Sequence, residues 1–311
     1  MTIVFLDAST VGDVPNLESL RHLGEVTFYD VTHPDETAKR IREADIIITN
    51  KVVLTRELME DAKNLKLICI AATGMNNVDR ETAADLGIEV KNVAGYASVS
   101  VAQTTFAMIL HLQMNLPGYD KFVKSGSYSE SLIFTNMGQN YHEISGMRFG
   151  IIGLGNIGQK VADIATAFGA EVVYYSTSGR NTDQPYKRLD LDELLSTSDI
   201  VSIHAPLNDN TENLISAEQL SLMKSSALLI NTGRGGIVNE SDLAHALDDE
   251  SIAGAGLDVF ENEPVKADNP LLSIKTKEKI VLTPHIAWAS VEARTELIEG
   301  VKENIETFID A

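Results

Sequence analysis

Three side chains in the last third of the chain have the chemical types that proton transfer and anion binding require. Arg234 follows the apolar run SALLINT, Glu263 lies in the stretch DVFENEP, and His285 ends the run KIVLTPH. A histidine with an unperturbed pKa of about 6.5 exchanges protons at neutral pH, and a neighbouring carboxylate favours its charged form. An arginine fork binds carboxylate and carbonyl oxygens. The set would suit reduction of a 2-oxo acid, which needs a hydride at the carbonyl carbon and a proton at its oxygen.

Each of these residues also has an ordinary interpretation. Taken alone, Arg234 would be a surface arginine, Glu263 a solvated carboxylate, and His285 a core histidine satisfied by a hydrogen bond. However, Arg234, Glu263 and His285 follow three successive apolar runs, and Asp258 ends the run that precedes Glu263. In an open parallel sheet, ligands bind beyond the carboxyl ends of the strands. We therefore expect the four side chains to line one crevice.

A glycine pattern upstream predicts what would supply the hydride. Gly153, Gly155 and Gly158 have the spacing G-x-G-x-x-G in RFGIIGLGNIGQKVADIATAFGAEVVYYS. In a dinucleotide-binding unit, the first glycine permits the turn, the second lets the backbone approach a pyrophosphate, and the third lets helix and strand pack closely. An ordinary tight turn is the alternative, but the context of strand, turn, helix and strand favours a dinucleotide site.

The second strand of this unit departs from the usual NAD pattern. An acidic residue commonly follows that strand and binds the ribose hydroxyls. Here the strand EVVYY is followed by Ser176, Thr177, Ser178, Gly179 and Arg180. Without a carboxylate to repel it, a 2′-phosphate could bind to Arg180 and the hydroxyls. The sequence therefore favours NADP(H), whereas a solvated loop with NAD(H) bound through the serine is the alternative.

Alternation of β-branched runs with helical stretches predicts two parallel-sheet α/β domains. The expected strands lie in 2–8, 25–31, 44–50 and 65–73 and, in a second series, in 148–153, 171–176, 199–205, 226–232, 252–259 and 279–285. A long helix begins near residue 100, and the polar stretch after it shows no clear strand. The last helix, 291–311, follows the second series, so the second domain is expected to be inserted into the first.

Composition excludes several classes of protein. The 311 residues suit about two domains, and a formal net charge of −20 disfavours nucleic acid and anionic membranes as partners. The single cysteine, Cys69, lies in an apolar run and is expected to be a core residue. We find no signal-peptide pattern, no stretch near the ~18 apolar residues of a membrane span, and no metal-ligand spacing. The sequence thus predicts a soluble, cytoplasmic protein.

The motifs GIIGLGNIG, LINTGRGGIV, GAGLDVFENEP and TPHIAWAS together resemble the D-isomer-specific 2-hydroxyacid dehydrogenase family nearly end to end. The resemblance implies that His285 is the general acid/base, Glu263 its partner, Arg234 the substrate anchor, and Asp258 a contact of the nicotinamide carboxamide. It also implies a Rossmann cofactor domain at 99–286, a flavodoxin-like substrate domain at 1–98 with 287–311, and a homodimer. The helix near residue 100 and the stretch after it would form much of the dimer contact.

The resemblance extends to further binding residues. It implies substrate binding by Thr73, Gly74 and Met75, whose glycine turn could offer backbone N–H groups to an anion. His204 lies at a strand end near the expected adenine side. The cofactor set, beyond the three glycines, Asp258, Ser176, Thr177, Ser178 and Arg180, comprises Asn156, Ile157, His204, Ala205, Pro206, Thr211, Thr232 and Gly233.

The stretches ATGMNNVD, NVAGYASVSVAQTTFA and PHIAWAS are most similar to the glycerate dehydrogenase and hydroxypyruvate reductase branch. This favours hydroxypyruvate or glyoxylate as the substrate. A D-lactate-type dehydrogenase is one alternative, and formate dehydrogenases, which carry glutamine at the acid partner's position, resemble the chain less. A dinucleotide-sensing, corepressor-like binding protein is the alternative outside enzymes. Trp288, the only tryptophan, would either wall the substrate pocket or pack between domains.

Overall fold

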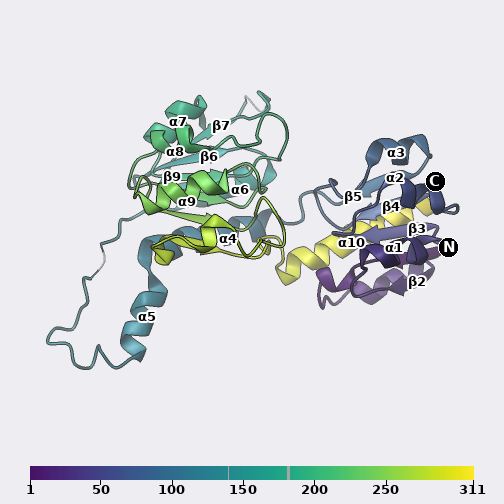
Figure 1. The fold of residues 1–311 in the computed structure, drawn as a ribbon, viewed down its shortest axis with the longest axis horizontal. Helices are drawn as coiled ribbons and strands as arrows, with labels where there is room; N and C mark the ends of the chain where they lie inside the picture. Colours follow the sequence, from purple (N-terminus) through teal and green to yellow (C-terminus); the bar gives the residue numbers. More distant parts are fainter. Residues whose placement is uncertain (139, 181–182) are drawn as a thin grey trace. The chain divides into compact units, whose positions relative to one another are not determined.

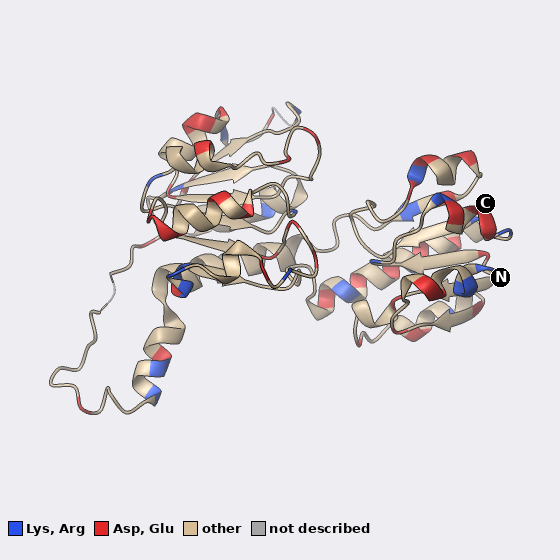
Figure 2. Cartoon of the chain, viewed as in Figure 1, with Lys and Arg blue, Asp and Glu red and all other residues tan. Residues whose placement is uncertain are grey.

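The computed structural model describes residues 1–138, 140–180 and 183–311 and divides into two compact units. One unit comprises residues 1–97 and 288–311, and the other comprises residues 98–287. The domain boundaries expected from the sequence differ from the boundaries between these units by one residue each. Both units are α/β, and acidic residues are spread along the chain of each of them (Figure 2). No helix among the described residues combines the length and apolar character needed to span a membrane.

The first unit is built on a five-stranded parallel sheet with the order β2-β1-β3-β4-β5 (Figure 1). Its strands are β1 (Thr2–Phe5), β2 (Glu25–Phe28), β3 (Ile46–Thr49), β4 (Leu67–Ile70) and β5 (Glu89–Asn92). Strands β3 and β4 are buried along their whole length, as continuous apolar runs in a parallel sheet should be. Cys69 is fully buried in β4, and burial raises the pKa of its thiol to about 12, so the thiol stays protonated.

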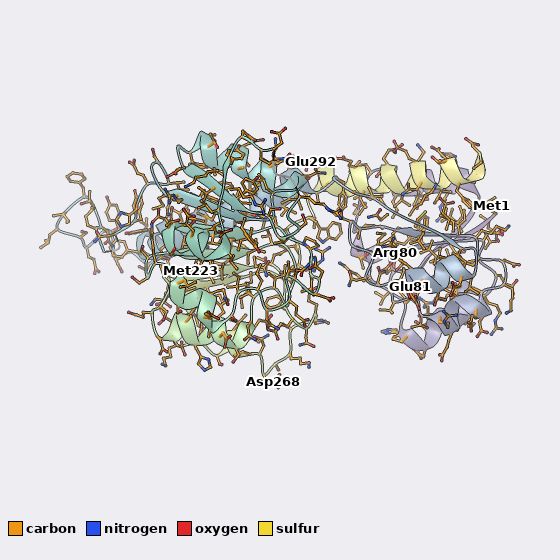
Figure 3. All side chains as sticks on the ribbon, turned by 90° about the horizontal axis from the view of Figure 1, so that it is seen from above. Met1, Arg80, Glu81, Met223, Asp268 and Glu292 are labelled. Carbon is orange, nitrogen blue, oxygen red and sulfur yellow. The ribbon has the colours of Figure 1, made fainter. Side chains whose placement is uncertain are left out.

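The helices of the first unit are α1 (Pro34–Ile41), α2 (Arg56–Asp61), α3 (Arg80–Asp85) and α10 (Val291–Ile309), with 3₁₀ helices at Ala8–Thr10 and Leu17–Leu23. Glu292, labelled in Figure 3, lies in the first turn of helix α10. This C-terminal helix contacts β4 and β5 of the first unit. The 3₁₀ helix at Leu17–Leu23 is seven residues long. Strand β5 was missed by sequence analysis because its residues, EVKN, are polar and only partly buried.

The second unit contains a seven-stranded parallel sheet with the order β12-β11-β10-β9-β6-β7-β8. Its strands are β6 (Arg148–Ile152), β7 (Glu171–Tyr175), β8 (Lys187–Arg188), β9 (Ile200–Ile203), β10 (Leu228–Asn231), β11 (Gly254–Leu257) and β12 (Ile280–Leu282). The chain runs outward from β6 to β7 and β8, then returns to β9 beside β6. The sheet therefore has its topological switch point between β6 and β9, as in Rossmann folds. The predicted fold class is confirmed.

Helices cover both faces of this second sheet. Helices α4 (Ser98–Met114) and α6 (Asn156–Ala167) share one apolar cluster with the sheet. Helices α7 (Leu191–Thr197), α8 (Ala217–Leu222) and α9 (Glu240–Asp248) share the cluster on the other face. Short 3₁₀ helices at Pro270–Leu272 and Lys277–Lys279 precede β12. The result is a rigid layered core whose strands all end at one edge.

One segment of the second unit lies outside this layered core. Helix α5 (Leu116–Lys124) and the chain after it project from the sheet and its helices (Figure 1). Residues 125–138 are exposed throughout and contain no strand, as expected, while position 139 lies outside the described residues. Leu132 is fully exposed, and Phe134 and Met137 are 87% and 78% exposed. So dense an exposed apolar segment is typical of a surface that another molecule covers.

Candidate active site

The glycine pattern forms the turn between β6 and α6. Gly153 has φ 91°, which a residue with a side chain rarely adopts. A Cβ on Gly158 would lie 2.3 Å from the Gly153 carbonyl oxygen, so this position requires glycine for close packing. A Cβ on Gly155, by contrast, would meet no protein atom within 4 Å. Gly155 is the N-cap of α6 and has no side chain that could cap the helix. The backbone N–H groups of Asn156 and Ile157, in the first turn of α6, are therefore open to an anion.

The loop after β7 is folded on itself. The Ser176 hydroxyl donates to the Arg180 carbonyl at 2.6 Å, and Ser178 Oγ accepts from the Arg180 N–H at 3.2 Å. Gly179, with φ 68°, completes the turn. Within residues 1–138, 140–180 and 183–311, the guanidinium of Arg180 makes no hydrogen bond or ion pair. The loop therefore presents a cation, with no carboxylate between 176 and 180 to oppose a phosphate.

His285 and Glu263 form the central pair of the site. His285 Nδ1 lies 2.7 Å from Glu263 Oε2, and Glu263 Oε1 accepts from the Phe260 N–H at 3.0 Å. The His285 side chain is 23% exposed. Its backbone has φ 56°, an unusual conformation for a residue with a side chain and one often found at functional sites. Nδ1 faces the carboxylate, and Nε2 is the ring nitrogen that points away from Glu263.

Asp258 holds the turn that carries His285. Its carboxylate accepts from the Thr283 hydroxyl at 2.6 Å and from the Ile286 and Ala287 N–H groups, both at 2.8 Å. The Asp258 carbonyl accepts from the His285 N–H at 2.8 Å. Burial of the side chain raises the pKa of Asp258. The family resemblance implied only a nicotinamide contact for Asp258. Its hydrogen bonds to the histidine turn join residues that lie 25 to 29 positions apart along the chain.

Arg234 lies beyond β10, in a turn held by Asn231. The Asn231 amide donates to the Arg234 carbonyl at 2.9 Å and accepts from the Gly233 N–H at 3.0 Å. The following residue packs directly on the loop that carries Glu263: a Cβ on Gly235 would lie 1.8 Å from the Phe260 carbonyl oxygen. Arg234, Glu263 and His285 thus follow the adjacent strands β10, β11 and β12 at one edge of the sheet, as expected.

The remaining predicted cofactor residues gather around the ends of β6, β9 and β10. Backbone atoms of Ala205 lie 2.9 Å from a Cβ placed on Gly153 and 3.0 Å from one placed on Gly233. Thr211 is fully buried, and its hydroxyl donates to the Pro206 carbonyl at 2.7 Å. The Thr211 side chain therefore stabilises the conformation of the loop after β9 and does not lie on the surface of that loop.

His204 is held by hydroxyl groups rather than by charges. Its Nε2 lies 2.8 Å from Ser202 Oγ, and its Nδ1 lies 3.3 Å from Thr232 Oγ1, which in turn lies 3.2 Å from Thr105 Oγ1. Desolvation lowers the pKa of His204 to about 3, so the ring is neutral at physiological pH. His204 can donate or accept a hydrogen bond there, but its partners in the described parts of the chain are hydroxyls, whereas His285 has a carboxylate partner.

Thr73, Gly74 and Met75 belong to the other unit, in the loop after β4. The Thr73 hydroxyl donates to the Val93 carbonyl at 3.1 Å, and the Asn92 amide donates to the Thr73 carbonyl at 2.6 Å. Trp288 also lies in that unit, where its ring meets Tyr96 edge-on with centroids 6.3 Å apart. Among the described residues, no group of three His, Cys, Asp or Glu side chains has a metal-binding arrangement.

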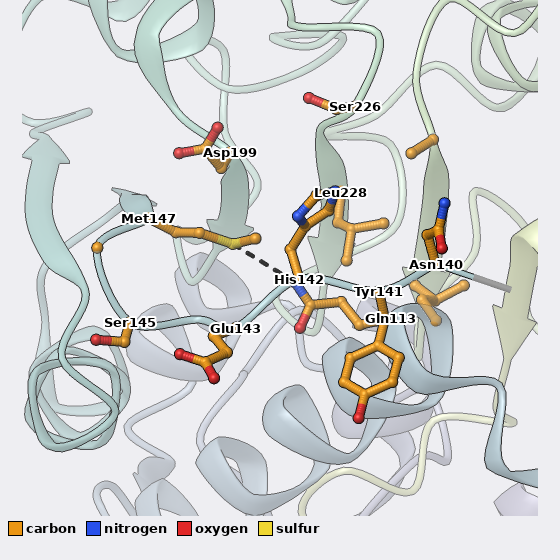
Figure 4. A pocket seen from close by; sticks show the side chains of 13 residues that line it. Gln113, Asn140, Tyr141, His142, Glu143, Ser145, Met147, Asp199, Ser226 and Leu228 are labelled. Atoms are coloured by element: carbon orange, nitrogen blue, oxygen red, sulfur yellow. Dashed lines mark hydrogen bonds between the residues drawn. The ribbon is translucent and has the colours of Figure 1, made fainter. Parts of the chain in front are cut away.

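A cavity of about 700 Å³ lies away from these residues, near the amino ends of the strands of the second unit (Figure 4). Gln113 of α4, residues 140–143 and 145–147, Asp199 and Ser226 are among its lining residues, and the Gln113 amide donates to the Met147 sulfur at 3.5 Å. Ligands of parallel sheets bind at the opposite, carboxyl edge. The cavity therefore does not form part of the candidate site.

Comparison with known proteins identifies the class. Residues 106–287 match the family model described as the NAD binding domain of D-isomer specific 2-hydroxyacid dehydrogenases. A hydroxypyruvate reductase of Blautia hydrogenotrophica is 36% identical over 99% of this chain and 97% of its own, and a glycerate dehydrogenase of Methylorubrum extorquens is 35% identical over 99% and 96%. The solved structure of the acyclic imino acid reductase Bsp5 with NADPH and D-Arg superposes with a TM-score of 0.89, covering 100% of this chain and 97% of that one at 32% identity.

The chain belongs to the D-isomer-specific 2-hydroxyacid dehydrogenase family. It is a nicotinamide-dependent dehydrogenase. The residues at the β6–α6 turn fit this cofactor, since the open space at Gly155 and the uncapped start of α6 suit a pyrophosphate.

The second and third glycines of the cofactor turn should respond differently to substitution by alanine. Gly155→Ala should leave the melting temperature of the free protein nearly unchanged, yet weaken cofactor binding roughly tenfold or more, about 1.4 kcal/mol, because the new methyl group fills open space beside the phosphates. Gly158→Ala should instead destabilise the free protein by about 1–3 kcal/mol through overpacking. Thermal melts and cofactor titrations of both variants check this, and unchanged cofactor affinity in Gly155→Ala would contradict the pyrophosphate position.

Proposed function

We propose that the protein reduces a small 2-oxo acid, hydroxypyruvate or glyoxylate in preference, to the D-2-hydroxy acid. The observation that carries the proposal is the 2.7 Å contact between His285 and Glu263, at the strand ends that follow the dinucleotide turn. Family membership and the similarity to a hydroxypyruvate reductase and a glycerate dehydrogenase support this substrate class. The bound nicotinamide supplies the hydride that adds to C2 of the substrate.

The side chains of the site then have complementary roles. Arg234 binds the substrate carboxylate and polarises the carbonyl through its guanidinium. His285 donates the proton on Nε2 to the oxygen at C2 as negative charge develops there. Glu263 keeps Nδ1 protonated and offsets the positive charge of the ring before transfer. Thr73, Gly74 and Met75 contribute backbone N–H groups to the carboxylate, so the unit of residues 1–97 and 288–311 acts as the substrate domain.

Loss of the histidine should separate chemistry from binding. His285→Ala should lower kcat by about 10²-fold or more, because no other group replaces the proton donor, while cofactor affinity stays nearly unchanged. The assay is the loss of reduced-cofactor absorbance with hydroxypyruvate, then with glyoxylate and pyruvate. His245→Ala, an exposed histidine on α9, is the matched control and should behave like the wild type.

Near-normal turnover in His285→Ala would refute its role as proton donor. Preference for pyruvate over both other substrates would favour a D-lactate-type dehydrogenase. Cofactor binding without turnover of any 2-oxo acid would favour the dinucleotide-sensing, corepressor-like alternative.

We infer that NADP(H) is the preferred cofactor. The cation of Arg180 and the hydroxyls of Thr177 and Ser178 would bind the 2′-phosphate, whereas Ser176 is already engaged with the loop backbone. The NADPH in the related imino acid reductase structure is consistent with this preference.

Replacement of Arg180 tests the cofactor preference. Arg180→Ala should weaken NADPH binding by about 1.5–3 kcal/mol, roughly ten- to a hundredfold, because it removes a hydrogen bond between charged groups. NADH lacks the phosphate and serves as the internal control, so its Kd should change little. The measurement is a titration of both cofactors by tryptophan or nicotinamide fluorescence, and equal losses for the two would show that Arg180 does not bind the phosphate.

We further propose a homodimer in which α4, α5 and residues 125–138 form much of the contact. The exposed Leu132 and Phe134 support this role, since a partner chain would cover them.

The dimer should dissociate when the exposed segment is made acidic. The mass of the wild type, measured by light scattering after size exclusion, should be that of two chains, and Leu132→Asp with Phe134→Asp should halve it. Leu222→Asp, at an exposed apolar position on α8, is the control and should remain a dimer. A single-chain mass for the wild type, or an unchanged mass for the double variant, would contradict this interface.

A further inference from the structure

A nearly inaccessible carboxylate lies beside the candidate active site without a cation to balance it. Glu240 is the first residue of α9 and is only 4% exposed. Within the described parts of the chain, no lysine, arginine or histidine forms an ion pair with it. Burial raises the pKa of Glu240, and the nearby carboxylates of Glu261 and Glu263 raise it further. An acidic side chain in such surroundings is costly, so it needs a physical reason.

The hydrogen bonds of Glu240 supply that reason. Its Oε1 accepts from the Glu261 N–H at 2.7 Å, and its Oε2 accepts from the side-chain amide of Asn269. In return, the Glu240 N–H donates to Glu261 Oε1 at 3.0 Å. The start of α9 and the loop after β11 are therefore joined in both directions. Glu240, a residue of a regular helix, thereby fixes the backbone N–H of Glu261 in an irregular loop.

The loop after β11, to which Glu240 is hydrogen-bonded, also carries Glu263. Phe260, the neighbour of the anchored Glu261, donates its N–H to Glu263 Oε1 at 3.0 Å, which leaves Oε2 facing His285 Nδ1 at 2.7 Å. On its other side, the Phe260 carbonyl packs against Gly235, where even a Cβ would not fit. The loop is thus confined between the arginine turn and α9, and Glu240 is its attachment to α9.

We propose that Glu240 is a positioning residue for the acid–base pair: its carboxylate fixes the Phe260–Glu263 loop so that Glu263 stays directed at His285. Among the described residues, the hydrogen bonds of Glu240 run to Glu261 and Asn269, so it acts on the pair through Glu261 and Phe260. The proposal deepens the proposed function and rests on it for its effect on turnover. The geometric part, that Glu240 sets the contact between Glu263 and His285, is testable without turnover.

Two variants of Glu240 remove its hydrogen bonds to the loop to different extents. Glu240→Met keeps the volume of the side chain but removes both acceptors. Glu240→Gln keeps one oxygen, so it can serve only one of the two donors. Asp242→Ala is the control for general damage: Asp242 lies in the first turn of the same helix and accepts from the Ala217 N–H at 2.8 Å, away from the loop. Circular dichroism and thermal melts establish that each variant is folded.

The decisive readout is the titration of the His285 imidazole, followed by NMR in ¹³C-histidine-labelled protein. The chain has seven histidines, and the signal missing from His285→Ala identifies the one needed. Loss of a well-placed carboxylate disfavours the charged ring, so the midpoint should fall by about 0.5–1 pH unit in Glu240→Met. It should fall by less in Glu240→Gln, and Glu263→Gln should shift it in the same direction. Asp242→Ala should leave the midpoint unchanged.

A midpoint that stays at the wild-type value in a folded Glu240→Met would overturn the proposal, as would an equal shift in Asp242→Ala. If Glu240→Met does not fold, Glu240→Gln decides the matter, and a midpoint indistinguishable from the wild type then overturns it. In the hydroxypyruvate assay, kcat should fall about tenfold in Glu240→Met with KM within about twofold, since the altered group acts on the reacting pair. Absence of wild-type turnover on every 2-oxo acid would refute the proposed function alone, because the titration still tests the positioning of Glu263.

Discussion

The contact between His285 and Glu263 is the interaction on which the rest of the site depends. It joins two loops that follow neighbouring parallel strands, β11 and β12, and such loops meet only because parallel strands end at the same edge of a sheet. A histidine at φ 56° is not a conformation that local sequence favours. The surrounding structure must therefore impose it, and Asp258 does so by accepting from three donors in the same turn.

Buried carboxylates, rather than ion pairs, give this edge of the sheet its rigidity. Asp258 and Glu240 are both nearly inaccessible, and burial raises the pKa of each. Their described partners are backbone N–H groups, a hydroxyl and an amide, which are neutral donors. Such donors occupy fixed directions, so each carboxylate fixes a loop at two or more points. Mobile surface ion pairs of the kind between Arg21 and Glu18 offer no comparable constraint.

Glycines make room for this network in two different ways. Gly158 and Gly235 are close-contact positions, where backbone atoms of other segments occupy the place of a side chain. Gly155 faces open space, which a phosphate group of the cofactor can fill. The distinction matters because the same residue type serves protein packing in the first case and ligand access in the second.

The sequence by itself determined the strand and helix series, the dinucleotide turn and the residue types at the strand ends. Periodicity, β-branched runs and glycine spacing are local properties, so they predicted both parallel sheets and placed Arg234, Glu263 and His285 beyond strands that are successive along the chain. Local patterns failed where the signal was weak, as at the polar strand β5 and at the two-residue strand β8.

Only the tertiary structure decided how those residues are held. The partners of Glu240 lie 21 and 29 residues away, those of Asp258 lie 25 to 29 residues away, and the neighbour of Gly235 belongs to another loop. In the sequence, Glu240 is an ordinary acidic residue in the first turn of a helix, a position favoured by the helix dipole and usually exposed. Its burial and its partners follow from how the strands bring separate loops together, and that information is not contained in the spacing of residues along the chain.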